Sequence, residues 1–475
     1  MGSLPHRPHF VILPFMSQGH TIPLLHLSRL LLLRRSAAIT IYTTAANSPP
    51  IRANLKDTDI TILELPFPQN IEGVPPGVEN TQHLPSMFSF LPFVKSTKLM
   101  QESFEKSLET LNPPVSCIIS DGFLGWTLES ANKLGVPRFA FFGMGTFATT
   151  MHQVLEREKP HAATVSLDEP FIIPGFSGLE LTRNDFEAPF NEIEPSGPYV
   201  EFMVEQIIAM AMSHGVIVNS FYELEKRYVD YWNEKIGPKI SCVGPLCMAA
   251  KSHVDITEKR SYVYDFLDEK LSEKRPVLYV AFGTQAKVSA EQLQAIAKGL
   301  EDSQVSFLWA LSTKGVDFFE GFKERVKDRG IVVEEWVDQV NILRHGGVEG
   351  FLSHCGWNSV LESVSASLPM VALPFMADQH LNARFVAEEA GVGLRIMPEG
   401  GGAVRGFVGA EEVERAVRDL MGGGDKGKEV RRKAAEYGAA ARESMREGGS
   451  SMLTLDLLVD EIVGKTTSFH GGELE

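Results

Sequence analysis

The chain has 475 residues, 44% of them hydrophobic, so it is too long for one ordinary core and suits two domains of roughly 200 residues each. Its 45 basic and 61 acidic residues give a formal net charge of −16, which repels nucleic acid and anionic membranes and argues against both as partners. The four cysteines show no paired metal-ligand spacing, and a chain of this size needs no disulfides, so a reducing cytoplasmic location is expected.

The N-terminal residues lack the apolar centre of a signal peptide. Residues 1–8 contain two prolines, and the next apolar run, 10–15, is short and interrupted by proline. The Leu-rich run 24–33 contains His26 and Arg29 and predicts a buried helix. A membrane span needs about 20 apolar residues, and none is expected here.

Short apolar runs alternate with longer helical stretches in both halves of the chain. This order predicts two parallel, doubly wound sheets in tandem, an α/β fold of two Rossmann-like domains with a cleft between them. The strands of the first sheet are expected at 10–13, 39–42, 60–65, 117–120, 139–142 and 216–219. Those of the second are expected at 277–282, 307–311, 331–334, 350–353, 370–373 and 393–396.

A mostly polar stretch without period separates the two series. It follows the run Val243-Gly244-Pro245-Leu246, and we place a linker at 248–262. The first domain is then 1–247 and the second 263–475. The C-terminal helices either remain with the second domain or pack back on the first.

Two polar residues follow strands of the first predicted sheet. His20 comes after the first strand, and Asp121 ends the strand at 117–120. The carboxyl ends of parallel strands form the ligand-binding edge of open α/β sheets, so the two side chains are expected to meet there. An imidazole with a pKa near about 6.5 is largely neutral at pH 7 and can accept a proton, while a carboxylate fixes its tautomer.

The segment 336–379 concentrates the groups that bind phosphate and hydroxyls. Its strand at 350–353 ends before His354, and the next helix begins within 356–359, where unpaired N–H groups and the helix dipole favour a diphosphate. Glu362, about one turn on, could accept from ribose hydroxyls. The carboxylate and amide of Asp378 and Gln379 could hold a pyranose.

This segment resembles the signature box of the plant family 1 UDP-glycosyltransferases. The resemblance is carried by Trp336, Gln339, His345, the run His354-Cys355-Gly356-Trp357-Asn358-Ser359, Glu362, Pro374, Asp378 and Gln379. It implies the GT-B fold, with the acceptor bound by the N-terminal lobe and UDP-sugar by the C-terminal lobe. It also implies that His20 is the catalytic base and Asp121 its helper, with no metal or other cofactor.

The resemblance further implies the role of each residue at the donor. Trp336 stacks on uracil, the Val337 backbone and Gln339 hold base and ribose, and Glu362 holds the ribose hydroxyls. The diphosphate meets His354, Gly356, Trp357, Asn358 and Ser359, and Gly283 and Thr284 are candidates for a second phosphate contact. Asp378 and Gln379 hold the sugar, and a final Gln favours glucose. Phe141 to Met144 stand where many relatives carry a Thr that touches the sugar, which leaves the sugar preference open.

The predicted function is inverting transfer of glucose from UDP-glucose to a hydroxyl of a small lipophilic acceptor in plant secondary metabolism, a flavonoid or other phenolic. Aromatic residues of the first domain allow an apolar acceptor pocket, for which Gly19, Phe88, Phe93, Phe123 and Phe142 are the candidates. A monomer is expected.

Several alternatives stay open at this stage. They are transfer to an aromatic carbon, a terpenoid or hormone acceptor, and a non-catalytic nucleotide-sugar sensor on the same scaffold. A dehydrogenase is disfavoured because the run from Pro14 to Gly19 contains only one glycine, so the dinucleotide fingerprint does not follow the first strand. A serine hydrolase is disfavoured because no G-x-S-x-G occurs.

Overall fold

A computed structural model describes residues 7–35, 37–249, 262–286, 288–311, 318–397 and 406–470. The chain forms two compact units, each made of segments that are not continuous in sequence. The first unit comprises Met1–Gly145, Ser196–Ala250 and Ser444–Glu475, and the second comprises Thr146–Pro195 and Lys251–Glu443. The predicted domains, 1–247 and 263–475, are continuous. Most of the predicted linker, 250–261, lies outside the described residues.

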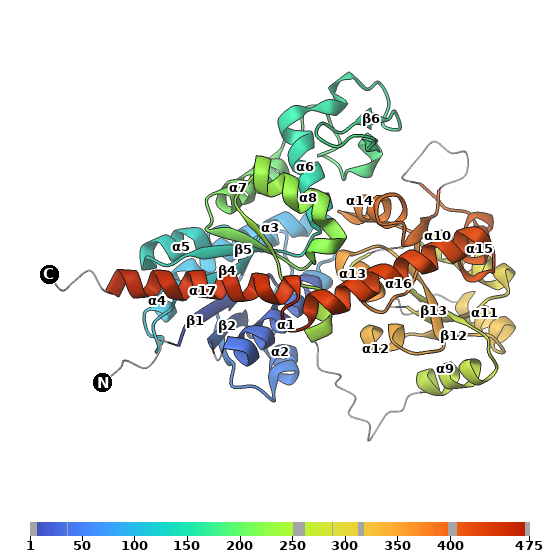
Figure 1. Ribbon diagram of the computed structural model, residues 1–475, viewed down its shortest axis with the longest axis horizontal. Helices are drawn as coiled ribbons and strands as arrows, with labels where there is room; N and C mark the ends of the chain where they lie inside the picture. The colour runs from blue at the N-terminus through green and yellow to red at the C-terminus, as the bar shows by residue number, and fades with distance from the viewer. Residues whose placement is uncertain are drawn as a thin grey trace. The chain divides into compact units, whose positions relative to one another are not determined.

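The first unit is built on a seven-stranded parallel sheet with the order β3-β2-β1-β4-β5-β8-β9 (Figure 1). Its strands are β1 (His9–Leu13), β2 (Ala38–Thr44), β3 (Thr61–Leu65), β4 (Cys117–Asp121), β5 (Arg138–Phe142), β8 (Gly215–Val218) and β9 (Ile240–Cys242). The order runs outward in both directions from the β1–β4 pair, in which Leu13 lies beside Ser120. Ligands bind at such a switch point in doubly wound sheets.

The first unit also contains α-helices on either side of these strands in sequence. They are α1 (Gln18–Arg35), α2 (Ser48–Leu55), α3 (Phe90–Ser96), α4 (Gln101–Leu108), α5 (Thr127–Leu134), α7 (Pro198–Ala211), α8 (Tyr222–Lys235) and α17 (Ser450–His470), with short 3-10 turns at η1 (Thr81–His83), η2 (Met87–Ser89), η3 (Thr97–Met100) and η6 (Leu246–Ala249). The helix α17, at the red end of the chain in Figure 1, belongs to this unit although it is last in sequence. Its apolar residues Leu455, Leu458 and Ile462 share a core cluster with residues of α1 and β1.

The second unit contains a six-stranded parallel sheet with the order β12-β11-β10-β13-β14-β15. Its strands are β10 (Val277–Ala281), β11 (Ser306–Ala310), β12 (Gly330–Val333), β13 (Val348–Ser353), β14 (Met370–Ala372) and β15 (Gly393–Arg395). The α-helices are α6 (Thr146–Glu158), α9 (Tyr262–Ser272), α10 (Ala290–Ser303), α11 (Phe318–Val326), α12 (Gln339–Leu343), α13 (Trp357–Ser365), α14 (Gln379–Arg384), α15 (Ala410–Met421) and α16 (Asp425–Met445), whose last residues belong to the first unit. A two-stranded hairpin, β6 (Phe171–Ile172) with β7 (Glu180–Leu181), 3-10 turns at η4 (Pro160–Ala163) and η5 (Arg183–Asp185), and a π-helix η7 (Phe385–Glu389) complete it.

The predicted α/β class with two parallel sheets is confirmed, and all twelve predicted strands are present within a few residues of their expected limits. The strands are continuous apolar runs because a parallel sheet is covered on both faces. The strand β9 and the β6–β7 hairpin were not predicted. Among the described residues, no helix is both long and apolar enough to cross a membrane.

Candidate active site

His20 and Asp121 meet at the switch point of the first sheet. The chain leaves β1 at Leu13, turns, and begins α1 at Gln18, which places His20 in the first turn of that helix. Its Nδ1 atom lies 2.7 Å from Oδ2 of Asp121, the last residue of β4. The Asp121 side chain is buried, and its Oδ1 atom accepts from the Phe123 N–H at 2.9 Å. With a proton held on Nδ1 by the carboxylate, Nε2 carries the lone pair that a base requires.

A buried cation, Arg138, lies behind Asp121. Its guanidinium donates to the main-chain oxygen of Asp121 at 3.3 Å and to the hydroxyls of Ser120 at 3.0 Å and Ser213 at 2.7 Å. Burial lowers the pKa of Arg138 to about 10, and the negative charge of Asp121 acts in the opposite direction. Arg138 was not predicted, because only the pairing of β4 with β5 brings it beside Asp121.

Aromatic rings surround His20 within the first unit. The rings of Phe15 and Phe123 each lie 5.4 Å from the imidazole, and Phe90 lies 5.8 Å from Phe123. Phe90 and Phe123 are half-buried. We call Phe15, Phe90 and Phe123 the aromatic cluster. Only Phe123 was among the predicted acceptor residues.

The other predicted acceptor residues lie in different environments. Gly19 is exposed beside His20, and the half-buried Phe142 ring fills the space over Gly122, where an added Cβ would approach it to 3.0 Å. Phe88 is 94% exposed. Phe93 is fully buried, 6.0 Å from the ring of Phe15, and therefore packs in the core beneath the aromatic cluster.

His354 lies between two glycines in the second unit, just after β13. A Cβ added at Gly283 would lie 2.8 Å from His354 Nε2, and one added at Gly356 would lie 2.6 Å from the same atom. The imidazole therefore occupies the space that any side chain at either position would need. Thr284 follows Gly283 in the exposed turn after β10. Burial lowers the pKa of His354 to about 4, so at pH 7 the ring is neutral and one nitrogen carries a hydrogen to donate.

The N-terminus of α13 follows directly. Its N-cap is Gly356, which has no side chain to accept from the N–H groups of the first turn. Asn358 and Ser359 follow Trp357 in the first turn of this helix. Trp357, the first helical residue, is buried with its ring 5.9 Å from Phe385. Cys355 is also fully buried, and burial raises the pKa of its thiol, which makes it a core residue rather than a nucleophile.

A partly buried chain of polar side chains joins β10, α12 and α13. Gln339 donates from Nε2 to Ser359 Oγ at 3.0 Å and to Glu362 Oε2 at 2.7 Å, while the hydroxyl of Tyr279 donates to its Oε1 at 3.2 Å. Burial raises the pKa of Glu362 to about 7, against the opposing effect of the Gln339 hydrogen bond. Tyr279 was not predicted, because it lies in the apolar run of β10 and its sequence context does not indicate that its hydroxyl reaches Gln339.

Trp336 and Val337 lie in the loop just before α12. The Trp336 side chain is 81% exposed, so its ring offers an apolar face for stacking, and Val337 is half-buried.

The turn 374–379 ends at the two predicted sugar residues. Gln379 uses its Oε1 atom to accept from the backbone N–H groups of Phe375 at 2.9 Å and Met376 at 3.1 Å. Asn382 donates to Oδ2 of Asp378 at 2.9 Å and to the Cys355 carbonyl at 2.9 Å, which ties this turn to the α13 N-terminus. Because its Oε1 is engaged, Gln379 can meet a sugar hydroxyl best as an Nε2 donor.

Two parallel α/β units of this kind, with a His–Asp pair at the switch point of one and a helix N-terminus without a side-chain cap beside a histidine in the other, are the features of a nucleotide-sugar glycosyltransferase of the GT-B class. Residues 204–399 match the family described as UDP-glucoronosyl and UDP-glucosyl transferase. UDP-glycosyltransferase 90A1 of Arabidopsis thaliana is 45% identical over 477 residues, which cover 97% of this chain and 98% of the relative. The chain belongs to the plant family 1 UDP-glycosyltransferases and is a UDP-dependent glycosyltransferase.

Solved structures agree with this assignment. Glycyrrhiza uralensis UGT73P12, complexed with glycyrrhetinic acid 3-O-monoglucuronide, aligns with a TM-score of 0.89 at 28% identity and 98% coverage of both chains. Phytolacca americana UGT2, complexed with UDP-2fluoro-glucose and pterostilbene, aligns with a TM-score of 0.77 at 26% identity, covering 96% of this chain and 99% of the other. Within the described residues, no group of three or more His, Cys, Asp or Glu side chains is arranged to bind a metal.

Proposed function

We propose that this glycosyltransferase transfers glucose from UDP-glucose to a hydroxyl of a small phenolic acceptor, with inversion at the anomeric carbon. The observation that carries the proposal is the 2.7 Å contact between His20 and Asp121 beside the aromatic cluster. A pure sensor needs no base at this position. The pterostilbene in the Phytolacca americana UGT2 complex supports a flat phenolic acceptor.

In the proposed mechanism, His20 Nε2 removes the acceptor proton while the acceptor oxygen attacks the anomeric carbon. The bond between that carbon and the UDP oxygen breaks, and its electron pair leaves with UDP. Asp121 stabilises the imidazolium, and the general-base step contributes about 10²–10⁴-fold. The aromatic cluster would hold the acceptor ring, with Gly19 and Phe142 beside it.

The second unit would hold the donor. Trp336 stacks on uracil, Val337 and Gln339 hold base and ribose, and Glu362 binds the ribose hydroxyls. The negative charge that develops on the leaving UDP is stabilised by the α13 N-terminus at Gly356 to Ser359, and by His354, Gly283 and Thr284. A helix N-terminus contributes about 0.3–2 kcal/mol to such an anion. Asp378 and Gln379 hold the glucose hydroxyls, with no metal required.

The test is incubation of the purified protein with UDP-glucose and a panel of flavonoids, simple phenols, terpenoid alcohols and hormones, followed by mass spectrometry. A product heavier by one hexose, with β-configuration by NMR, supports inverting transfer and identifies the acceptor class. Resistance of the product to acid would indicate a carbon linkage instead. Binding of UDP-glucose without product from any acceptor would favour the sensor alternative. Full activity of His20→Ala would refute the assignment of the base.

A further inference from the structure

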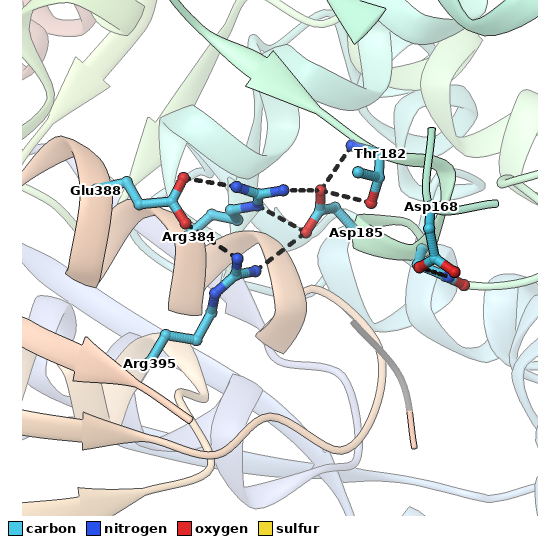
Figure 2. A network of polar contacts seen from close by, with 7 residues as sticks. Asp168, Thr182, Asp185, Arg384, Glu388 and Arg395 are labelled. Atoms are coloured by element: carbon cyan, nitrogen blue, oxygen red, sulfur yellow. Dashed lines mark hydrogen bonds and ion pairs between the residues drawn. The ribbon is translucent and has the colours of Figure 1, made fainter. Parts of the chain in front are cut away.

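A charged network connects the segment Thr146–Pro195 to the region after the sugar-binding turn, within the second unit (Figure 2). Asp185, whose side chain is fully buried, receives both Nε and Nη2 of Arg384, at 2.9 and 3.0 Å. Arg395 approaches the same carboxylate at 3.4 Å. Glu388 lies on the other side of both guanidinium groups, at 2.6 Å from Arg384 and 3.1 Å from Arg395. Bidentate pairs of this kind fix geometry as well as charge.

Asp185 is itself held rigidly by its own turn. Its Oδ2 atom accepts from the Thr182 N–H at 2.7 Å, and the Thr182 side chain accepts from the Asp185 N–H, which together form a capping box around η5. The Thr182 hydroxyl also donates to Oδ2 at 3.0 Å. Because these hydrogen bonds fix the Asp185 carboxylate, the carboxylate restrains the position of Arg384, the last residue of α14.

The same segment contacts the other end of this short helix. Glu187, two residues after Asp185, accepts from the backbone N–H of Ala377 at 3.0 Å. Ala377 has a φ of 53°, in the left-handed region that alanine rarely adopts, and directly precedes Asp378. The residues 182–187 thus hold the stretch 377–384 at both ends, and the sugar residues Asp378 and Gln379 lie between the two contacts.

The uridine side of the donor site depends on other contacts. Gln339, Ser359 and Glu362 are joined to one another and to Tyr279, and His354 is held by its two neighbouring glycines. Glu187 contacts the backbone just before Asp378, whereas Gln339 lies on α12 and Ser359 and Glu362 lie on α13. Removal of the Glu187 carboxylate should therefore weaken binding of the sugar of UDP-glucose without weakening binding of UDP.

We propose that Glu187 and Asp185 are positioning residues that set the sugar-binding turn, so that they govern affinity for the hexose of the donor without contacting uridine. This inference rests on the proposed role of Asp378 and Gln379. Glu187 stabilises the left-handed turn before Asp378, and Asp185 fixes α14 through Arg384. The donor preference for glucose then depends partly on Glu187 and Asp185, which lie 149 and 151 positions before Trp336, the first residue of the signature box.

The test compares UDP with UDP-glucose binding by calorimetry in Glu187→Ala, Glu187→Gln and Asp185→Asn. In Glu187→Ala we expect UDP-glucose affinity to fall about tenfold, or about 1.4 kcal/mol, while UDP affinity stays within twofold. Glu187→Gln should recover part of the loss, since its amide oxygen still accepts from Ala377. Discrimination against UDP-galactose should fall in parallel. Glu194→Ala, on the same segment and paired with Lys159 at the surface, is the matched control.

A second readout needs no ligand. Hydrogen exchange of the Ala377 amide should accelerate about tenfold in Glu187→Ala and remain unchanged in Glu194→Ala. Unchanged exchange, or an equal loss of UDP and UDP-glucose affinity, would overturn the inference. If wild-type protein binds UDP but not UDP-glucose, the proposed function fails instead, and the exchange measurement still decides whether Glu187 sets the turn.

Discussion

Glu362 allows a quantitative test of the proposed donor site. Its carboxylate is predicted to bind ribose and, in the protein without ligand, to lower the free energy of unfolding. Burial raises its pKa from an ordinary 4.5 to about 7. Between these values the unfolded chain loses its proton while the folded chain keeps it. Stability therefore falls as pH rises through this window, and the full cost is present above pH 7.

The size of this effect follows from the two pKa values. Their difference, from 4.5 to about 7, corresponds to at most about 3.4 kcal/mol, at about 1.36 kcal/mol for each tenfold change in the ionisation constant. Since the Glu362 side chain is only half-buried by surface area, screening by solvent reduces the figure, and we expect about 1–2 kcal/mol.

The assay is urea unfolding of wild type and Glu362→Gln at pH 5 and pH 8. We expect nearly equal stability at pH 5 and a variant more stable by about 1–2 kcal/mol at pH 8, together with weaker UDP binding. Glu349→Gln, an exposed glutamate on β13, should show neither effect. A difference between Glu362→Gln and wild type that is the same at both pH values would refute the reasoning, because only the titrating carboxyl predicts a difference that grows with pH.

Three further substitutions test other parts of the chain. His20→Ala should lower kcat by about 10²–10⁴-fold and leave the calorimetric Kd for UDP unchanged, because a base is needed only for the acceptor proton. Gly356→Ala places a Cβ 2.6 Å from His354 Nε2, so the ring must move, and UDP affinity should fall about tenfold by calorimetry. Leu458→Ala empties a buried position in the core of the first unit and should cost about 2–5 kcal/mol in urea unfolding.

Controls for these substitutions are available in the chain. Gly423→Ala adds a Cβ with nothing within 4 Å and should leave UDP affinity unchanged. Leu457→Ala, at a position 66% exposed on the same helix as Leu458, should cost little. If His20→Ala loses UDP binding as strongly as activity, its effect is structural. Equal losses in the two leucine variants would argue against burial of α17.

The sheets could be predicted from sequence because each central strand is a continuous apolar run, buried on both faces, between helices. The runs 10–13 and 277–282 are of this kind. The strand β9 has only three residues, Ile240-Ser241-Cys242, and its apolar signal is too short to separate from a loop. The hairpin of β6 and β7 pairs two residues with two, and its pairing depends on tertiary context.

The candidate donor residues lie within 44 positions of one another, so a local motif was enough to propose them. Residues that contact them from elsewhere in the chain were not predicted: Tyr279 reaches Gln339 from β10, and Asp185 reaches Arg384 from a distant turn. Arg138 was missed for a similar reason, because it reaches Asp121 only through the pairing of β4 with β5. Composition does not distinguish a core phenylalanine from one near His20. Of the predicted acceptor residues, Phe93 lies in the core and Phe88 is exposed. Phe15, which was not among them, lies 5.4 Å from His20, and Phe90 packs against Phe15 and Phe123.

The position of α17 has a consequence for how the protein is made. The first 145 residues cannot complete their hydrophobic core until Leu455 to Ile462 have left the ribosome, more than 300 residues later. Contacts so distant in sequence form slowly, and until they form, the incompletely folded unit exposes apolar surface. The unit that contains His20 is synthesised first but completes its core last, so substitutions in α17 should cause misfolding of the N-terminal segment.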